Sequence, residues 1–347
     1  MMWQATLRDL QWRRRRFLIA ITGTALVFAM SLLLSGLASS FTLETNRTLH
    51  TIGADVWIVK QGASGPFTAF SPVPDTDATR VAATPGVTEA QPIIYLHQTV
   101  GEKPKDINLF GVVPGSLGEP TVAHGRRLQS SGEALADTTL GVGIGEQVEM
   151  AGRSYDVVGT TKHTTLNGGI PTMFISLKDA QTLLAGNAVA SAIVATGTPT
   201  APIDGLRVMT VDEARDDLLR PLQNAAQSIN FVKVLLWIVA ACIIGSIVYL
   251  SAMERTRDFA VFKATGTSNS ALGFGLAIQA VVLAVAAAVI ASVLATLLAP
   301  IFPLPVEIPT SAYLTLFAIA IVVGLLASLA GLRRAVKIEP ALAFGGP

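Results

Sequence analysis

The chain has 347 residues, of which 51% are hydrophobic and only 14% charged, and its formal net charge is +1 at pH 7. Soluble globular domains carry about 25% charged residues, so the composition excludes an ordinary soluble protein and predicts a membrane protein. The net charge gives no reason to expect a nucleic-acid partner. The single cysteine, Cys242, excludes a disulfide framework or a cysteine-based metal cluster.

Residues 1–16 begin the chain with Trp3, Leu7 and Leu10 at helical spacing beside charged residues, which predicts a cytoplasmic amphipathic helix. The apolar run 17–39 follows and is long enough to span a bilayer, which takes roughly 20 residues. The same region also fits a cleavable signal, because Arg14-Arg15-Arg16-Phe17-Leu18 has the twin-arginine pattern. The length of the run favours a retained helix, since signal peptides have apolar runs of about 7–15 residues.

The segment 40–229 is polar enough to lie outside the membrane and is predicted to fold as a mixed α/β extracytoplasmic domain. Thr210 and Glu213 have the spacing of a capping box at the start of a helix that leads towards the next apolar run. The expected strands are 54–60, 87–100, 106–113, 146–150, 154–159, 172–176 and 188–195, and the other expected helices are 75–83 and 177–185.

Three further apolar runs, 230–252, 271–298 and 313–332, complete a predicted integral membrane protein with four transmembrane helices. The link 299–312 contains neither Lys nor Arg. Lys and Arg do occur before the first run, in the segment 253–270 and in the tail 333–347. By the positive-inside rule, both termini are expected on the cytoplasmic side of a membrane that the chain crosses in multiple passes.

The sequence contains no recognisable catalytic constellation. It has no P-loop, its four histidines are widely separated, and no ion-binding residue lies in the middle of a span, which argues against a proton-coupled transporter. The adjacent acids Asp216 and Asp217 are predicted to lie on a solvated helix face. We therefore predict a protein that is not an enzyme.

The segment 253–270 concentrates charge between two apolar runs. A charge at the bilayer centre costs roughly 2.5–3.5 kcal/mol, so this segment must lie at a membrane surface. On one continuous helix, Glu254 and Asp258 would be four residues apart and Phe259 and Phe262 three apart, giving separate charged and aromatic stripes. Charge alone leaves two interpretations open, which are docking onto a cytoplasmic protein and binding of membrane lipid phosphates by the basic residues.

The segment also carries a family resemblance. Its motif Glu254-Arg255-x-Arg257-Asp258-Phe259-Ala260-Val261-Phe262-Lys263-Ala264-x-Gly266 resembles the E-R-x-R-E-I-G-V-L-K-A-x-G segment of FtsX/MacB-type permeases of ABC transporters. The tail from Leu332 to Ala343 resembles the closing segment of that family. The order of one span, a large outer domain and three spans is also the family's. The stretch 53–57 is most similar to the DevC-like branch.

The resemblance implies a non-catalytic permease subunit of a bacterial cytoplasmic (inner) membrane. It would work as a homodimer with two copies of a cytoplasmic ABC ATPase. ATP and Mg²⁺ would bind to the ATPase, and this chain would bind no cofactor and no metal. The segment 253–270 would be a coupling helix whose basic residues meet acidic residues of the ATPase and whose two phenylalanines fill a pocket there. The implied coupling residues are Glu254, Arg255, Arg257, Asp258, Phe259, Phe262, Lys263 and Gly266, and the implied tail contacts are Arg333, Arg334, Lys337 and Pro340.

The family further implies that ATP hydrolysis moves the extracytoplasmic domain by mechanotransmission. The expected activity is export of lipid, glycolipid, peptide or drug, with or without an extracytoplasmic adaptor. The alternative is an FtsX-like regulator that transports nothing and controls a cell-wall hydrolase. A sensor that does not depend on ATP is a third interpretation.

Overall fold

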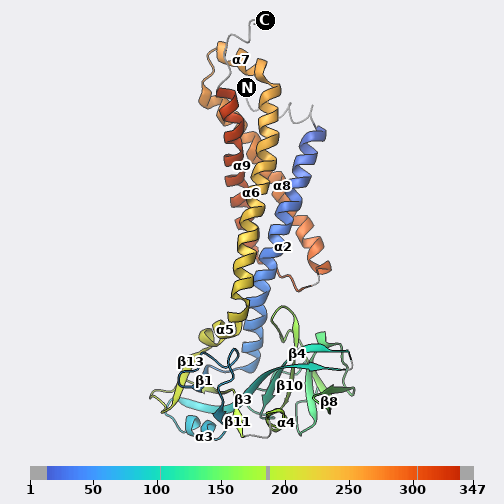
Figure 1. The fold of residues 1–347 in the computed structure, drawn as a ribbon, viewed down its shortest axis with the longest axis vertical. Helices are drawn as coiled ribbons and strands as arrows, with labels where there is room; N and C mark the ends of the chain where they lie inside the picture. The colour runs from blue at the N-terminus through green and yellow to red at the C-terminus, as the bar shows by residue number, and fades with distance from the viewer. Residues whose placement is uncertain (1–13, 102, 185–187, 303, 337–347) are drawn as a thin grey trace. The chain divides into compact units, whose positions relative to one another are not determined.

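The computed structural model describes residues 14–101, 103–184, 188–302 and 304–336. The chain divides into a helical unit, formed by Met1–Ser39 and Ala225–Pro347, and an α/β unit, formed by Ser40–Asn224 (Figure 1).

Four helices of the structure are long and apolar enough to cross a membrane. These helices are α2 (Arg14–Ile52), α6 (Gln223–Glu254), α8 (Asn269–Leu298) and α9 (Thr310–Val336). The short helix α7 (Thr256–Ala264) lies between α6 and α8 in the chain, and the 3₁₀ turn η3 (Ala299–Ile301) lies between α8 and α9. The helix α2 is longer than the predicted first span, because it continues through the first residues of the α/β unit. Residues 1–13, where an amphipathic helix is predicted, lie outside the described part of the chain.

Small residues dominate the core of the helical unit. The alanines of α8 that are fully buried are Ala280, Ala284, Ala287, Ala288, Ala291 and Ala295. At Gly324 of α9, an added Cβ would lie 2.8 Å from the Cα atom of Val281 on α8. Small side chains therefore let α8 and α9 approach closely, and close backbone approach is the main source of helix association in lipid.

Polar side chains link α6 to two other helices of this unit. The indole Nε1 of Trp237 donates to the Ser31 hydroxyl of α2 at 2.9 Å. The amide of Gln279 on α8 donates to the Ser251 hydroxyl of α6 at 3.4 Å, and both of these side chains are buried. Within a membrane, no water is available to satisfy these polar groups. Hydrogen bonds of this kind therefore help to fix how neighbouring helices are oriented.

The α/β unit contains an eleven-stranded sheet with the order β13-β1-β12-β3-β4-β10-β6-β8-β5, together with β7 and β9, while β11 pairs with β2. Two pairings are parallel, those of β4 with β10 and of β6 with β8. The strands are β1 (Val56–Lys60), β2 (Val73–Pro74), β3 (Val87–Val100), β4 (Lys105–Val112), β5 (His124–Gly125), β6 (Glu133–Asp137), β7 (Gln147–Met150), β8 (Arg153–Thr161), β9 (Thr165–Leu166), β10 (Ile170–Ser176), β11 (Val189–Ala190), β12 (Ala192–Gly197) and β13 (Leu206–Thr210). The helices are α3 (Asp77–Ala82), η1 (Thr138–Leu140), α4 (Leu177–Leu183), α5 (Val211–Leu219) and η2 (Arg220–Leu222).

Each predicted strand has a counterpart in the structure, although 188–195 is divided into β11 and β12. The strands β6 and β13 and the two-residue strands β2, β5 and β9 were not predicted. The sequence of β6, E-A-L-A-D, is poor in β-branched and aromatic residues, so its propensity is low. Its centre is nevertheless fully buried between β10 and β8. The predicted strands 146–150 and 154–159 form a hairpin, because β7 and β8 pair around Ala151 and Gly152, which both have positive φ.

The predicted capping box at the start of α5 is also confirmed. The Thr210 hydroxyl accepts from the Glu213 backbone N–H at 3.2 Å, and the Glu213 carboxylate accepts from the Thr210 N–H at 2.9 Å. The hydrogen bond from the Thr210 backbone N–H is the largest cause that lowers the pKa of the Glu213 carboxyl, and a hydrogen bond from the Arg207 guanidinium also lowers it. Pro221 interrupts the helix only by the 3₁₀ turn η2, after which α6 begins.

Asp217 corrects one prediction. Asp216 is exposed as predicted, but Asp217 is only 1% exposed. Its carboxylate accepts from the backbone N–H groups of Phe67 and Thr68, at 2.9 and 3.2 Å, and from the Thr68 hydroxyl. Neighbouring helix residues point about 100° apart, so two adjacent acids need not share an environment. Asp217 therefore fastens the loop after β1 to α5.

Glu44 makes a similar attachment from α2. Its side chain is 4% exposed, and its Oε2 accepts from the backbone N–H groups of Gly168 and Gly169, each at 3.1 Å. One turn further, the Thr48 hydroxyl donates to the Thr165 carbonyl at 3.1 Å. The part of α2 that belongs to the α/β unit is thus hydrogen-bonded to the turn between β9 and β10.

Candidate coupling helix

The charged segment folds as α7, which is separated from α6 by a break at Arg255. The backbone angles of Arg255, φ −103° and ψ 22°, are not helical. The Thr256 hydroxyl donates to the Met253 carbonyl at 2.5 Å, a local bond of the kind that competes with helix continuation. The prediction of one continuous helix is therefore wrong, because Glu254 ends α6 while Asp258 lies on α7.

Gly266 terminates α7. Its φ is +90°, and no heavy atom would lie within 4 Å of an added Cβ, so only the backbone conformation calls for glycine. The N–H of Gly266 donates to the Lys263 carbonyl at 3.0 Å, and the N–H of Thr267 donates to the Phe262 carbonyl at 2.9 Å. This arrangement is a helix C-cap that satisfies the last carbonyls. Ser268 then caps α8 by accepting from the Ala271 N–H.

One face of α7 is buried against the helical unit. Phe259 is 4% exposed and Ala260 is fully buried, while Phe262 is half-buried against the same core. The prediction that Phe259 fills a pocket in the ATPase is therefore wrong. Its ring already packs inside this chain, where burial of an aromatic side chain stabilises the position of the short helix.

The opposite face of α7 is exposed and consists of Arg257, Asp258, Val261 and Ala264. These residues lie at positions i, i+1, i+4 and i+7, which share one side of a helix. We call them the α7 outer face. Within the described residues, Arg257 has no ion-pair partner, whereas the Asp258 carboxylate lies 3.6 Å from Arg255 Nε. The outer face thus combines one charge of each sign with an apolar centre.

Three of the predicted coupling residues make contacts inside the helical unit. The Arg255 guanidinium lies over the Phe259 ring, 5.5 Å from its centroid. Lys263 Nζ donates to the Val336 carbonyl near the end of α9 at 2.7 Å. Glu254 Oε1 lies 2.7 Å from Arg16 Nη1 of α2. Sequence reasoning missed Arg16, because no local pattern links residues so far apart in the chain.

The predicted tail contacts are only partly covered by the structure. Arg333 lies on α9 with an exposed side chain, and Arg334 lies on the same helix. Lys337 and Pro340 lie outside the described residues, so their predicted role stays a prediction.

Groups suited to catalysis or metal binding do not assemble around α7. The four histidines, His50, His97, His124 and His163, are all exposed. Across the described ranges, no three side chains of the His, Cys, Asp and Glu types gather closely enough to hold a metal ion.

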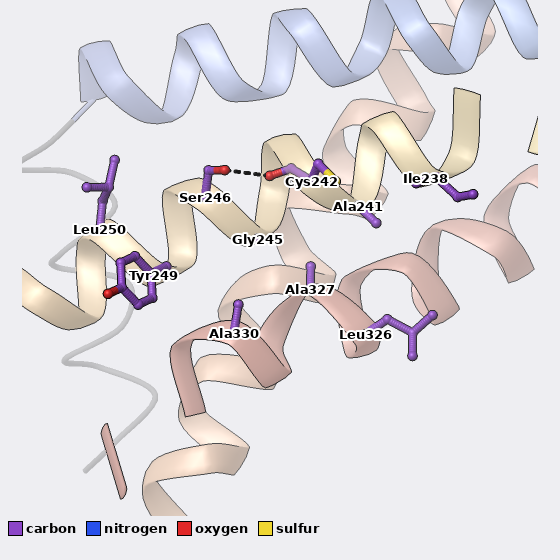
Figure 2. Close-up of a pocket in the computed structure, with 10 residues that line it drawn as sticks. All are labelled: Ile238, Ala241, Cys242, Gly245, Ser246, Tyr249, Leu250, Leu326, Ala327 and Ala330. Atoms are coloured by element: carbon purple, nitrogen blue, oxygen red, sulfur yellow. Dashed lines mark hydrogen bonds between the residues drawn. The ribbon is translucent and has the colours of Figure 1, made fainter. Parts of the chain in front are cut away.

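A groove with a volume of about 660 Å³ lies between α6 and α9 (Figure 2). Its ten lining residues include no charged side chain, and its polar atoms are few. The Ser246 hydroxyl donates to the Cys242 carbonyl at 2.8 Å within α6. The lining residues are Ile238, Ala241, Cys242, Gly245, Ser246, Tyr249, Leu250, Leu326, Ala327 and Ala330. Such a lining is apolar enough to face lipid and contains no carboxylate, histidine, lysine or arginine.

Comparison with known proteins identifies the family. Residues 230–340 match the family described as FtsX-like permease C-terminal, and residues 17–207 match the MacB-like periplasmic core domain. The chain belongs to the FtsX/MacB-type ABC transporter permeases. The resemblance drawn from its motifs is thereby confirmed, as is the fold of four candidate transmembrane helices with an α/β extracytoplasmic domain.

Similar proteins include full-length relatives. The uncharacterized ABC transporter permeases Rv2563 and Rv0072 of Mycobacterium tuberculosis are each 45% identical to this permease over 346 residues, covering 99% of both chains. Among solved structures, the extracellular domain of the noncanonic ABC-type transporter YknZ from Gram-positive bacteria aligns with a TM-score of 0.35 and 14% identity, covering 45% of this chain and 99% of that one. The periplasmic region of MacB from Actinobacillus actinomycetemcomitans aligns with a TM-score of 0.35 and 12% identity, covering 48% and 94%.

Membership of this family has consequences for the whole chain. It is a membrane permease, and permeases of ABC transporters are typically non-catalytic subunits that work with a cytoplasmic ATPase.

Proposed function

We propose that the α7 outer face is the surface on which a separate cytoplasmic ABC ATPase docks. Supporting this proposal, α7 is held from behind by Phe259 and Ala260 while Arg257, Asp258 and Val261 face outwards. A short helix anchored on one side and exposed on the other presents a rigid surface, which lowers the entropic cost of binding.

The charges of this face favour a protein partner over lipid. A basic helix that holds lipid phosphates needs a positive surface. The outer face instead carries Arg257 and Asp258, which have opposite charges, beside Val261, a residue that is 45% exposed. An apolar centre with charges of both signs at its rim suits a groove on a protein, where opposite charges set specificity.

In this proposal the permease works as a homodimer with two ATPase copies, which bind ATP and Mg²⁺. Both termini and α7 are cytoplasmic. Each hydrolysis cycle shifts α7, and the movement reaches the extracytoplasmic domain, where lipid, glycolipid, peptide or drug is exported, with an adaptor where the envelope requires one. Family membership supports the permease class, and the proposed mechanism and cargo class follow the resemblance of the α7 motif.

The test is a charge reversal on the outer face with a matched control. The Arg257→Glu variant is purified from the native host in detergent, and co-purifying proteins are identified and quantified by mass spectrometry. We expect its ATPase to bind about tenfold more weakly, which corresponds to a loss of ~1.4 kcal/mol. The control is Arg15→Glu, which makes the same charge change at an exposed arginine of α2.

Equal recovery of the ATPase with Arg257→Glu and with the control would contradict docking through this face. Deletion of the gene in the host then separates the two activities that the family allows. Accumulation of a cargo supports export. A cell-wall defect together with a hydrolase bound to the extracytoplasmic domain would replace export by hydrolase regulation.

A further inference from the structure

The groove between α6 and α9 is deeper than the packing of these two helices requires. Its lining includes Gly245 of α6 and Ala327 of α9, which are both buried (Figure 2). A Cβ added to Gly245 would lie 3.6 Å from the Ala327 carbonyl oxygen and 3.8 Å from the Ala327 Cα, which is ordinary van der Waals contact. Alanine, the better helix former, would therefore fit at this position. The glycine leaves open space that the contact between the helices does not demand.

Larger side chains bound this space along α6. Ile238 lies towards one end of the groove and Tyr249 towards the other, with the small residues Cys242 and Ser246 between them (Figure 2). These two ends are about 16 Å apart along the helix, since each residue adds about 1.5 Å. The volume of about 660 Å³ is in the range of sites that enclose small ligands. The groove is thus elongated and of limited length.

The chemistry of the groove calls for an apolar occupant. None of its lining residues is charged, and the Ser246 hydroxyl is already bonded to the Cys242 carbonyl of its own helix. The groove residues of α6 lie inside the predicted span 230–252, where the surroundings are hydrocarbon and not water. A polar ligand would lose its hydrogen bonds there, and an empty groove would lose dispersion contacts along its walls.

Two occupants have this chemistry, an acyl chain of a bilayer lipid and a helix of a second copy of the chain. Helices approach each other closely where small residues line the contact. Here Ile238 and Tyr249, at the two ends, are 54% and 39% exposed, and Leu326 beside Ala327 is 57% exposed. A helix about 10–12 Å wide would rest on these large side chains above the buried glycine. A flexible acyl chain is thin enough to lie between them.

We propose that the groove holds one acyl chain of a membrane phospholipid. Tyr249 lies five residues before Glu254, where α6 ends, so the lipid belongs to the leaflet on the side of α7. Tyrosine is enriched at membrane interfaces, where its ring is in apolar surroundings and its hydroxyl is near the head groups. The proposal does not depend on docking of the ATPase, because no groove residue belongs to the α7 outer face.

The test uses the full permease in nanodiscs that contain phosphatidylglycerol with a diazirine in the middle of one acyl chain. After irradiation, mass spectrometry locates and quantifies the crosslinked residues. Ala330→Leu and Ser246→Leu each fill the groove from an exposed position, one on α9 and one on α6. Ala318→Leu is the matched control, because it makes the same change at an exposed position of α9 outside the groove. Melting temperatures verify that each variant is folded.

In the wild type and in Ala318→Leu, we expect crosslinks between Cys242 and Tyr249 of α6. Each groove-filling variant should lower their yield about tenfold, because overpacking by a leucine side chain weakens binding by at least that factor. The yield at Val293 of α8, which is 57% exposed, serves as the reference for lipid that is not held in a groove. It should be equal in all four proteins.

Three results would overturn the proposal. The first is an equal yield of groove crosslinks in the wild type and in a folded groove-filling variant. The second is a wild type that crosslinks at Val293 and not in the groove. The third is a disulfide between the Cys242 residues of two copies, formed in the same nanodiscs without groove crosslinks, which would show that a second copy covers the groove. Ala330 and Ser246 lie on different helices, so a folding defect in one variant leaves the other as the test.

Discussion

At the scale of single residues, Asp217 shows how one buried carboxylate organises its neighbours. It accepts from two backbone N–H groups and one hydroxyl of the loop after β1, and this loop places Phe67 against Trp57 and Tyr95 with ring centroids 5.1 Å apart in each pair. The same hydrophobic cluster includes Leu218 of α5. The loop, the aromatic side chains and α5 are therefore held as one assembly.

Truncation of this carboxylate should be costly. We expect Asp217→Ala to lower the free energy of unfolding by about 1–3 kcal/mol, because the N–H groups of Phe67 and Thr68 would be left without their acceptor. Asp216→Ala is the matched control, and as an exposed residue it should change stability by no more than about 0.5 kcal/mol. Thermal unfolding of both variants in the same detergent makes the comparison. Equal melting temperatures for the two variants would show that the buried hydrogen bonds contribute nothing.

Residue-level contacts also divide the α7 motif into two groups. Glu254, Arg255 and Lys263 contact α2, the Phe259 ring and the end of α9, whereas Arg257 points outwards. A motif that resembles a docking sequence therefore includes residues that hold the helix and residues that face away from it. Their residue types alone do not separate these roles, since arginine serves in both.

At the scale of elements, the packing of α8 against α9 depends on Gly324. An added Cβ would lie 2.8 Å from Val281 Cα and 3.0 Å from Val281 N, and backbone atoms cannot move aside as a flexible side chain can. Gly266 is a different case, because it is required only by its positive φ at the end of α7. The two glycines therefore serve packing and chain direction respectively.

Gly324→Ala should force α8 and α9 apart and cost about 1–3 kcal/mol, the usual effect of overpacking. The control is Gly23→Ala on α2, where no heavy atom lies within 4 Å of the added Cβ. That change should be neutral or stabilise the helix by about 0.5–1 kcal/mol, since alanine is the better helix former. Unfolding by heat in one detergent compares the two, and a Gly324→Ala variant as stable as Gly23→Ala would refute the close contact.

At the scale of the whole molecule, the orientation of the chain follows from the distribution of its basic residues. The segment that includes α7 contains Arg255, Arg257 and Lys263, whereas the link 299–312 contains no Lys or Arg. By the positive-inside rule, α7 and this link are predicted to lie on opposite sides of the membrane.

Cysteine labelling on intact cells measures this directly. In a Cys242→Ser background, a membrane-impermeant maleimide should label Leu304→Cys in the outer link and should not label Thr265→Cys beyond α7 until the membrane is permeabilised. Leu304 is 40% exposed and Thr265 is exposed, so accessibility within the protein does not limit either reaction. Labelling of Thr265→Cys on intact cells would reverse the proposed topology and remove α7 from the cytoplasm.

The sequence by itself determined the membrane spans, most strands of the extracytoplasmic domain and the family. Apolar run length, alternation and capping patterns are local properties, so Val87–Val100 and the Thr210–Glu213 capping box could be read directly. The strand β6 and the buried state of Asp217 could not be predicted locally, because both depend on partners distant in the chain that supply burial and hydrogen bonds.

The functional segment shows the same division. Its charges predict that α7 lies at a membrane surface, and its motif identified the permease family, both from residues contiguous in the sequence. Only the tertiary structure decided that Phe259 faces inwards, that Glu254 meets Arg16 and that Lys263 meets the end of α9. The physical reason is that a helix has two faces, and which of them is buried depends on the neighbouring helices that pack against it.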